Sequence, residues 1–443
     1  MTKMTNAVST SRDGARFLEG IPANKKRRKG YVLMTGAAIL TVLFGFLGLA
    51  ADVGYLQWLK RRAQTAADSA ALAGTHELKR GSTSDVVIAV AKQNSALNGF
   101  QDGANGVSVT VNPPPTSGFY VGDASAVEVI VRRSHATFFL QVLRLYSATV
   151  AARAVAHIGS SSGCIYTLDP NAKIGLLVGG GGLIQVNCGI VDNATGLAAS
   201  VTGGSIVQAT SIDLVGGYNE GGGGYFNPTP STGMDPVDDP LAYLTPPSWG
   251  GTDAFCGVGP DYNNRRIDGV ATLNPGVYCG GIEIKSGSIV TFNEGQYILV
   301  GYGLQATGGP VLQGTNVTFY NTYNPTSSNK IAQKPGPILL GGGGSSTLSA
   351  PTEGPYAGIL FFTDRTADPE VKNDISGGST TKWEGVFYSR NQFLRYGGGG
   401  GNYASYTGIV VGNLEFSGGS TFNNDYTVVK TGSPFKGQVV FGE

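Results

Sequence analysis

Four cysteines carry the clearest chemical signal in this chain. Cys164 and Cys188 lie 24 residues apart, and Cys256 and Cys279 lie 23 apart. Both spacings are close to one coil of a β-helix, so pairing in sequence order would join neighbouring coils. Four cysteines allow three connectivities. We expect Cys164–Cys188 and Cys256–Cys279, and disulfides indicate an oxidising compartment. A zinc site is the rival interpretation, but the chain has no Cys-x-x-Cys pair and no histidine after His157.

Two acidic loops raise the question of catalysis. Glycoside hydrolysis requires two carboxylates at a controlled separation. Both loops lie among Pro or Gly residues, where acidic side chains are ordinary turn formers, and neither has EF-hand spacing. We therefore expect a non-enzymatic protein without catalytic residues, cofactor or metal, and keep a polysaccharide-active β-helix enzyme as an alternative. The acidic residues are Asp235, Asp238 and Asp239 in one loop, and Asp364, Asp368, Glu370 and Asp374 in the other.

The other chemistry-bearing patterns are weak. The three histidines are scattered, and the glycine runs lack the Gly-Lys-Ser/Thr ending of a phosphate loop, so we interpret the runs as flexible corners. A net charge of +1 gives no field that attracts nucleic acid. The histidines are His76, His135 and His157, and the glycine runs occupy 179–182, 221–224, 341–344 and 397–401.

An apolar stretch at 31–51 predicts where the chain meets a membrane. It holds no charged residue over 21 positions, enough for a helix to cross the hydrocarbon core of a bilayer. A buried core helix is the alternative, but such helices rarely run so long without a polar face. A cleaved signal peptide is disfavoured because the helical pattern continues to about Lys79. The side chains expected to anchor the chain in lipid include Tyr31, Leu33, Ile39, Leu43, Phe44, Phe46 and Leu49.

The charges around this stretch predict its orientation. Five basic residues precede it at 25–29, and three follow at 60–62. The positive-inside rule therefore favours a cytoplasmic N-terminus, with a disordered tail at 1–24. The helix expected over 25–79 is rich in alanine between Ala63 and Ala73. Small side chains let a partner helix approach closely, although alanine also simply favours helix.

Two further regions follow the helix. Residues 80–158 predict a small α+β module with a helix from Asp85, strands at 106–111 and 126–131, a short helix at 138–143 and a strand at 147–158. We expect this module to pack against the long helix. Residues 160–443 contain short β-branched runs, Gly-rich corners and a loose repeat (286–293 and 417–423). This pattern favours a parallel β-helix. A β-sandwich is the alternative, but the only Asn-Gly hairpin signals, at Asn98 and Asn105, lie before this region.

The N-terminal pattern resembles a known family. Residues 27–74 join basic residues and a glycine to an apolar helix, an Ala-Asp-Val-Gly-Tyr stretch at 51–55 and an intact Gln-x-Ala-Ala-Asp-x-Ala-Ala-Leu-Ala-Gly segment at 64–74. This order resembles the start of TadG-like (TadE/G-like) proteins of Flp pilus assembly. The resemblance implies a bacterial, single-pass inner-membrane component of the tight-adherence (Tad) pilus machinery, with its bulk in the periplasm or exposed at the surface.

Gly30 also resembles a prepilin processing site, because it follows Lys29. The fifth residue after it is Thr35 rather than the glutamate of prepilins, so we expect an uncleaved anchor. The expected partners are the lipid bilayer, pilus-assembly proteins or pilin helices through the Ala-rich helix, and cell-wall or surface glycans through exposed tyrosines. The alternative to an assembly component is a minor pilin or tip adhesin incorporated in the filament.

Overall fold

The computed structural model describes residues 29–160, 163–256, 262–342, 344, 346–377, 382–398, 406–418, 420–422, 425, 429–430 and 432–442. It divides into two units, one containing the described residues up to Arg61 together with Ser134–Val150, the other Arg62–Arg133 together with Ala151–Glu443. The predicted tail at 1–24 and the basic residues at 25–28 lie outside the described residues.

One continuous helix, α1 (Lys29–Lys79), carries both the apolar stretch and the Ala-rich segment, as the sequence predicts. No proline interrupts it, and it ends where Gly81 adopts a φ of 82°. Glycine reaches this left-handed region without a steric penalty. A second helix, α2 (Ser84–Leu97), follows at once, where the sequence predicts a helix from Asp85.

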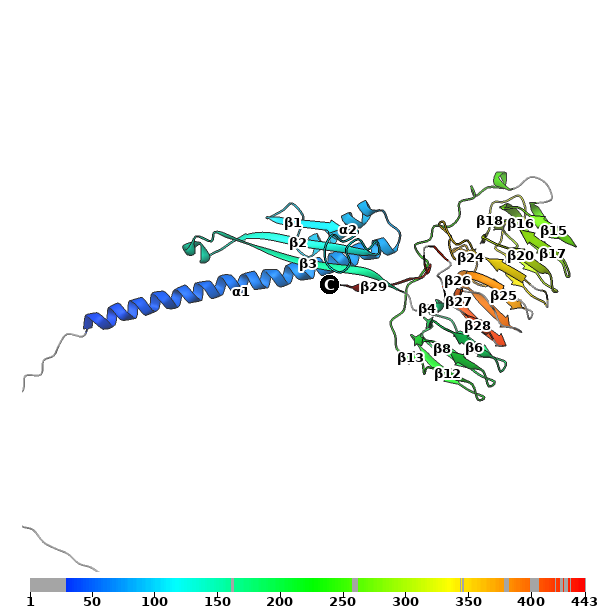
Figure 1. Ribbon diagram of the computed structural model, residues 1–443, viewed down its shortest axis with the longest axis horizontal. Coiled ribbons are helices and arrows are strands. Elements are labelled where there is room, and N and C mark those ends of the chain that lie inside the picture. Colours follow the sequence, from blue (N-terminus) through cyan, green and yellow to red (C-terminus); the bar gives the residue numbers. More distant parts are fainter. Residues whose placement is uncertain are drawn as a thin grey trace, which may run out of the picture. The chain divides into compact units, whose positions relative to one another are not determined.

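The small module has a four-stranded sheet in the order β1-β2-β3-β29 (Figure 1). Strand β1 (Val107–Asn112) pairs antiparallel with β2 (Ala126–Ala136). A short 3₁₀ helix, η1 (Leu140–Leu143), lies between β2 and β3 (Ser147–Ser160). The fourth strand, β29 (Lys436–Phe441), pairs antiparallel with β3. The sequence groups these C-terminal residues with the β-helix, whereas the structure pairs them with the module.

The Ala-rich face of α1 packs inside the module. Ser69 Oγ donates to Asn94 Oδ1 of α2 at 2.6 Å, and Thr75 Oγ1 donates to the carbonyl of Ala156 in β3 at 3.1 Å. Small side chains permit this close approach, as in membrane helix pairs. The predicted packing of the module against the long helix is therefore observed. The fully buried alanines are Ala63, Ala66, Ala67, Ala70 and Ala71.

A buried carboxylate organises the sheet. Glu128 of β2 is fully buried and accepts hydrogen bonds from Asn112 Nδ2 and Arg153 Nε, both at 2.7 Å. It also accepts hydrogen bonds from the Thr116 and Ser117 hydroxyls and from the Thr116 backbone N–H. Burial by itself would raise the pKa of Glu128, but these donors outweigh it and lower the pKa to about 2.

The remaining strands form a parallel β-solenoid of about 11 turns, which confirms the predicted β-helix. Each strand pairs with the equivalent strand one coil away, so Tyr297 of β18 lies beside Phe319 of β21. Four strands turn corners between faces: β14 (Asn263–Ile267), β16 (Gly276–Ile284), β26 (Lys382–Gly398) and β27 (Thr407–Gly418).

The other strands of the solenoid stack in three faces. The first face contains β4 (Gly163–Thr167), β7 (Gly189–Asp192), β10 (Ser211–Leu214), β13 (Ser231–Thr232), β18 (Gly295–Val300), β21 (Val317–Thr322) and β24 (Ile359–Thr363). The second contains β5 (Ile174–Gly179), β8 (Leu197–Val201), β11 (Gly217–Glu220), β19 (Leu304–Ala306), β22 (Ile338–Leu340) and β25 (Lys372–Gly377). The third contains β6 (Leu183–Val186), β9 (Ile206–Gln208), β12 (Tyr225–Asn227), β15 (Val270–Leu273), β17 (Ile289–Phe292), β20 (Val311–Gly314), β23 (Ser346–Ser349) and β28 (Ser420–Phe422).

The order of coils in space differs from their order in the chain. Strand β27 pairs with β26 on one side and with β4 and β5 on the other, placing Ile409 beside Ile165 and Leu414 beside Leu176. Strand β28 likewise pairs with β6. We call this junction of the last coil with the first the seam. In Figure 1 the red and orange strands accordingly lie between the green and the yellow ones.

A connecting segment, described at 233–256 and 262, lies between β13 at one end of the stack and β14 at the other. It starts after β13, where the backbone N–H of Val237 donates to Asn193 Oδ1. Further on, Asp239 Oδ2 accepts a 2.6 Å hydrogen bond from the Tyr388 hydroxyl, and the carbonyl of Thr245 accepts one from Tyr356. It then reaches β14 at the opposite end. Its described residues are thus held by coils along much of the stack.

Aromatic rings fill the coils, and tyrosines join the phenylalanines there. Tyr297 stacks near Phe319 with ring centroids 5.3 Å apart, and Phe319 lies 5.3 Å from Phe361. Offset aromatic contacts of this kind stabilise a core beyond the burial of their area. The sequence left open whether tyrosines are exposed for glycans. Tyr278, Tyr297, Tyr388 and Tyr406 are fully buried, whereas Tyr218 and Tyr225 are exposed.

Asp192 of β7 is a buried carboxyl group whose ionisation is costly. Its Oδ1 accepts the Ala194 N–H at 2.8 Å, while Oδ2 has no hydrogen-bond partner among the described residues. Burial raises the pKa of Asp192 to about 7, although hydrogen bonds from Thr167 and Ala194 oppose the shift. A raised carboxyl pKa means that the folded state holds a proton which the unfolded chain releases near pH 4. Stability is therefore lost as pH rises from about 4 to about 7.

We expect Asp192→Asn to stabilise the solenoid by about 2–4 kcal/mol at pH 8 and by less at pH 5, since the amide keeps the Ala194 bond and never ionises. Hydrogen exchange at β7 in the detergent-solubilised chain measures this gain. Asp213→Asn, a half-buried neighbour on β10, is the matched control and should leave exchange at β7 unchanged. A gain that is equal at both pH values would contradict the assignment.

Candidate membrane-anchoring site

The apolar half of α1 is the first part of the site. Among the described residues it is the one helix long and apolar enough to cross a membrane. The seven predicted anchor side chains, Tyr31, Leu33, Ile39, Leu43, Phe44, Phe46 and Leu49, are between 37% and 77% exposed. A helix that is apolar on all sides and uncovered by its own chain is suited to a lipid environment. Gly30 lies in its first turn.

A carboxylate at the end of this stretch ties α1 to a distant hairpin. Asp52 is buried and accepts hydrogen bonds from the backbone N–H groups of Phe138, Phe139 and Leu140 at 3.0, 2.8 and 2.6 Å. These donors lie at the start of η1, which has no cap from its own neighbouring side chain. A carboxylate satisfies such orphan donors with charge-assisted bonds. Asp52 therefore fixes where the hairpin sits along α1.

The loop between β2 and β3, residues 137–146, is what Asp52 holds, and we call it the hairpin tip. The Thr137 N–H donates to the carbonyl of Tyr146 at 3.1 Å, and the Leu145 N–H donates to the carbonyl of Leu140 at 3.2 Å. Arg144 ends η1 in the left-handed region with a φ of 65°. The tip is thus closed by its own backbone and has a defined conformation.

Close packing joins the tip to the apolar half of α1. A Cβ atom built on Gly48 would lie 2.7 Å from the Phe139 ring, so only glycine permits this contact without movement. Beside it lies an apolar groove of about 320 Å³. Its lining residues are Val42, Gly45, Phe46 and Leu49 of α1, and Phe139, Leu140, Val142 and Leu143 of the tip.

An aromatic cluster adjoins the Asp52 contact. The Tyr55 ring lies 4.7 Å from His135, 5.9 Å from Phe138 and 5.4 Å from Trp58. Tyrosine and tryptophan, with one apolar and one polar end, are enriched at membrane–water boundaries. Lys60 and Arg61 follow within two turns of the helix. The order along α1 is therefore apolar, aromatic and then basic.

The four cysteines, which the sequence also predicts as site residues, lie in the solenoid and its connecting segment. Cys164 pairs with Cys188 and Cys256 with Cys279. The first bond joins neighbouring coils, because β4 pairs with β7. The second bond joins β16 to the end of η2 (Asp253–Phe255), which belongs to the connecting segment rather than to a regular coil. This disulfide therefore fastens the connecting segment to β16, at the end of the stack that begins with β14.

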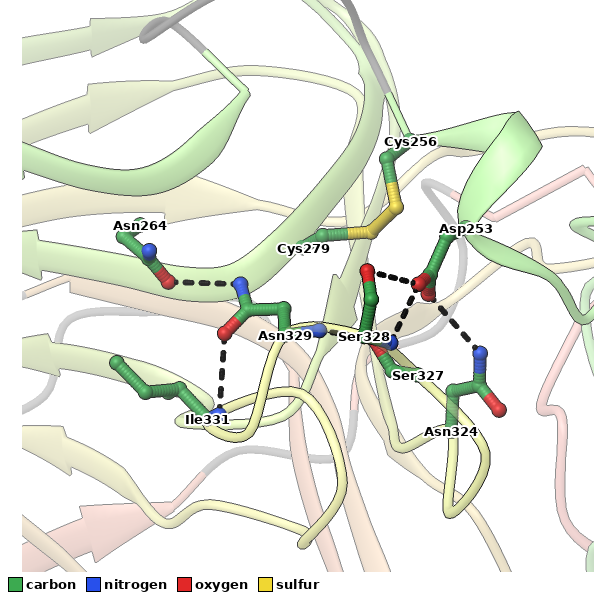
Figure 2. The surroundings of a disulfide bond; sticks show 9 residues. All are labelled: Asp253, Cys256, Asn264, Cys279, Asn324, Ser327, Ser328, Asn329 and Ile331. Carbon is green, nitrogen blue, oxygen red and sulfur yellow. Dashed lines mark hydrogen bonds between the residues drawn. A yellow bond between two sulfur atoms is a disulfide. The ribbon is translucent and has the colours of Figure 1, made fainter.

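Figure 2 shows a loop near this second disulfide that is hydrogen-bonded to Asp253 and Asn264. Asp253 Oδ2 accepts the backbone N–H and the hydroxyl of Ser328 at 2.6 and 2.7 Å, and Asp253 Oδ1 accepts Asn324 Nδ2 at 3.2 Å. Asn329 donates to Asn264 Oδ1 at 2.9 Å. Hydrogen bonds from Ser327 and Ser328 lower the pKa of Asp253 to about 2. The Asp253 carboxylate is therefore ionised and holds this loop at pH values above its pKa.

The acidic residues considered for catalysis make structural contacts. Asp239 is buried between Tyr388 and the guanidinium of Arg365, whose Nε lies 3.7 Å away. Asp364 accepts the hydroxyls of Tyr320, Thr322 and Thr366. Asp368 accepts the Glu370 N–H, and Asp374 lies 3.6 Å from Arg395. Asp235 and Asp238 line a cavity of about 350 Å³. In the described residues no group of three or more His, Cys, Asp or Glu could hold a metal ion.

Sequence reasoning missed Asp52 and the tip as parts of this site. Asp52 stands in the Ala-Asp-Val-Gly-Tyr stretch that carries the family resemblance, but a single carboxylate at the end of an apolar run is also what marks the edge of a membrane span. The predicted helix at 138–143 corresponds to η1 at Leu140–Leu143. The signal that could have found the tip is its run of apolar residues without an acidic one between 134 and 150.

Comparison with known proteins supports the N-terminal part of this picture. The family described as putative Flp pilus-assembly TadE/G-like matches residues 30–90. No curated protein and no solved structure matches the chain. The matched range contains the apolar stretch, Asp52, the buried alanines and the first half of α2. Residues 30–90 of this chain are therefore similar to the TadE/G-like family of Flp pilus assembly, in the region where the sequence pattern predicts that resemblance.

Proposed function

We propose that this protein is an inner-membrane-anchored component of Tad/Flp pilus assembly that acts in tight adherence through its solenoid, without catalysis. The family match over the helix at 30–90 is the observation that carries the proposal. In it, α1 crosses the membrane once with the N-terminus in the cytoplasm, as the basic residues at 25–29 favour. The solenoid then lies in the periplasm or at the surface, where disulfides persist.

The proposed partners follow from what the module leaves exposed. The buried alanines of α1 are occupied by α2 and β3, so pilus-assembly proteins or pilin helices would contact the remaining surface of the helix. Glycans of the cell wall or surface would meet exposed rings of the solenoid, such as Tyr218 and Tyr225. The negative face of an exposed aromatic ring attracts the C–H groups of a sugar ring laid against it.

The pairing of β3 with β29 allows a clean deletion of the solenoid. Ser160 lies opposite Lys436 in that antiparallel pair, so residues 161–435 can be replaced by an Asn-Gly turn that closes a two-residue hairpin. We expect this variant to stay in the membrane fraction and to lose adherence, measured by surface attachment of cells. Full-length protein at the same abundance is the control. Normal attachment by the shortened protein would refute the proposed role of the solenoid.

A minor pilin or tip adhesin is the second candidate, because Gly30 follows a basic cluster and begins the long helix α1. Intact mass and N-terminal sequencing of the protein from membranes and from sheared filaments separate the two functions. An intact N-terminus found only in membranes supports the fixed component. A chain that starts at Tyr31 and is present in filaments supports the pilin.

A further inference from the structure

We propose that the hairpin tip (residues 137–146) is a second membrane contact, which enters the same leaflet that α1 leaves and lays its apolar groove against lipid acyl chains. The inference rests on the proposed span of α1. The inference adds a lipid-binding surface to the anchor. That surface is made by the tip, which lies about 90 residues after Asp52, the residue of α1 that holds it.

The depth of the tip follows from two fixed contacts on α1. Gly48 touches the Phe139 ring, and the groove continues to Val42. If the span ends at Ala51, Gly48 lies about 5 Å and Val42 about 14 Å below that end, at 1.5 Å per residue. Only the Asp52 contact lies at the boundary. If the last turns of the span lie in the hydrocarbon core, the part of the tip that packs on them therefore lies there too.

The surface of the tip has the chemistry of a lipid contact. Its apolar side chains are open to the surroundings rather than packed, with Val142 83% and Leu143 66% exposed. An exposed apolar patch of this kind marks an interaction site. Most of its backbone N–H groups donate within the tip or to Asp52, which lowers the cost of burying them in hydrocarbon. The other exposed apolar residues of the tip are Phe138, Phe139, Leu145 and Tyr146.

The net positive charge of the tip also suits a membrane leaflet with anionic headgroups. The stretch from 134 to 150 has Arg144 and no acidic residue. Arginine reaches from an apolar surface to headgroup phosphates while its stem stays buried. Lys60 and Arg61 on α1 supply two more cations just beyond the aromatic cluster. The tip and α1 together would thus present apolar, aromatic and basic layers to one leaflet.

Photocrosslinking in the full chain tests the proposal. Val142→p-benzoylphenylalanine is placed in vesicles of phosphatidylethanolamine and phosphatidylglycerol, and lipid adducts are identified by mass spectrometry. Val270, 82% exposed on the solenoid, receives the same substitution as a matched control, and Phe44 within the span receives it as a positive control. We expect a lipid adduct at 142 comparable with that at 44, and none at 270.

The outcomes separate the tip from the span. Adducts at 44 without adducts at 142 would overturn the tip contact and leave the anchor standing. Adducts to a second protein chain at 142 would overturn it in favour of a helix partner in the groove. Absence of lipid adducts at 44 would overturn the membrane span itself, and with it both proposals. A second variant, Leu143→p-benzoylphenylalanine, guards against local misfolding at 142.

Discussion

Gly281→Ala is expected to open the solenoid locally at β16 and β19, at a cost above about 4 kcal/mol, in the range that marks steric disruption of a core. Gly281 is buried and has a φ of 65°. An added Cβ atom would lie 2.4 Å from the carbonyl oxygen of Gly303 and 2.7 Å from that of Gly301. Both obstacles are backbone atoms of the next coil, so no side-chain rotation can relieve the clash.

Gly287→Ala isolates the contribution of backbone conformation. Gly287 lies six residues further along, has a φ of 73° and would meet nothing within 4 Å. We expect a loss of only roughly 1–2 kcal/mol, the cost of a left-handed conformation for an L-residue. Hydrogen exchange of β16 to β20 in the intact chain reports both local opening free energies. Equal losses at the two positions would show that close approach of the coils is not what requires Gly281.

Glu128→Ala is expected to destabilise the small module by about 3–5 kcal/mol, because removing one partner of a buried ion pair leaves Arg153 and four other donor groups without their acceptor. The loss should appear as faster exchange in β1, β2 and β3. It should also vary with pH in a defined direction. Since the folded pKa of Glu128 is lowered to about 2 from 4.5, its contribution is complete above pH 4.5 and disappears as pH falls toward 2.

An exposed ion pair provides the control for Glu128. Glu353 lies 2.8 Å from Lys430, and both side chains are 69% exposed. Glu353→Ala should leave the exchange rates nearly unchanged, because an exposed ion pair contributes little to stability. The pH profile offers an independent check on the module. Wild type should lose protection in β2 between pH 4.5 and 2, whereas Glu128→Ala should show no such step.

Local sequence patterns were enough to predict the elements of the fold. The apolar run from Tyr31 set the position of α1, and alternation at 107–111 and 126–131 located β1 and β2. The loose repeat at 286–293 and 417–423 marked a real equivalence: each segment leads around a corner into a third-face strand, β17 or β28. Glycine corners and β-branched runs are local signals, and a solenoid repeats them in every coil.

Contacts between distant residues could not be predicted in the same way. Nothing near Ile409 indicates that it lies beside Ile165, since every parallel coil edge presents the same backbone groups to any neighbour. The pairing of β29 with β3 has the same origin. Asp52 is similar: its partners are backbone N–H groups more than 80 residues away, and backbone donors leave no trace in side-chain composition.

The seam also determines how the solenoid would bear a mechanical load. The chain enters the stack at β4 and leaves it after β28, and these strands lie in adjacent coils. The two coils at the ends of the stack come from the middle of the sequence and are joined by the connecting segment. Tension along the chain would therefore be applied at the middle of the stack, where strands have partners on both sides, rather than at a free end that could peel coil by coil. The antiparallel pair β3–β29 draws the two attachment points together, so a pull through α1 would shear that pair before it reached any coil.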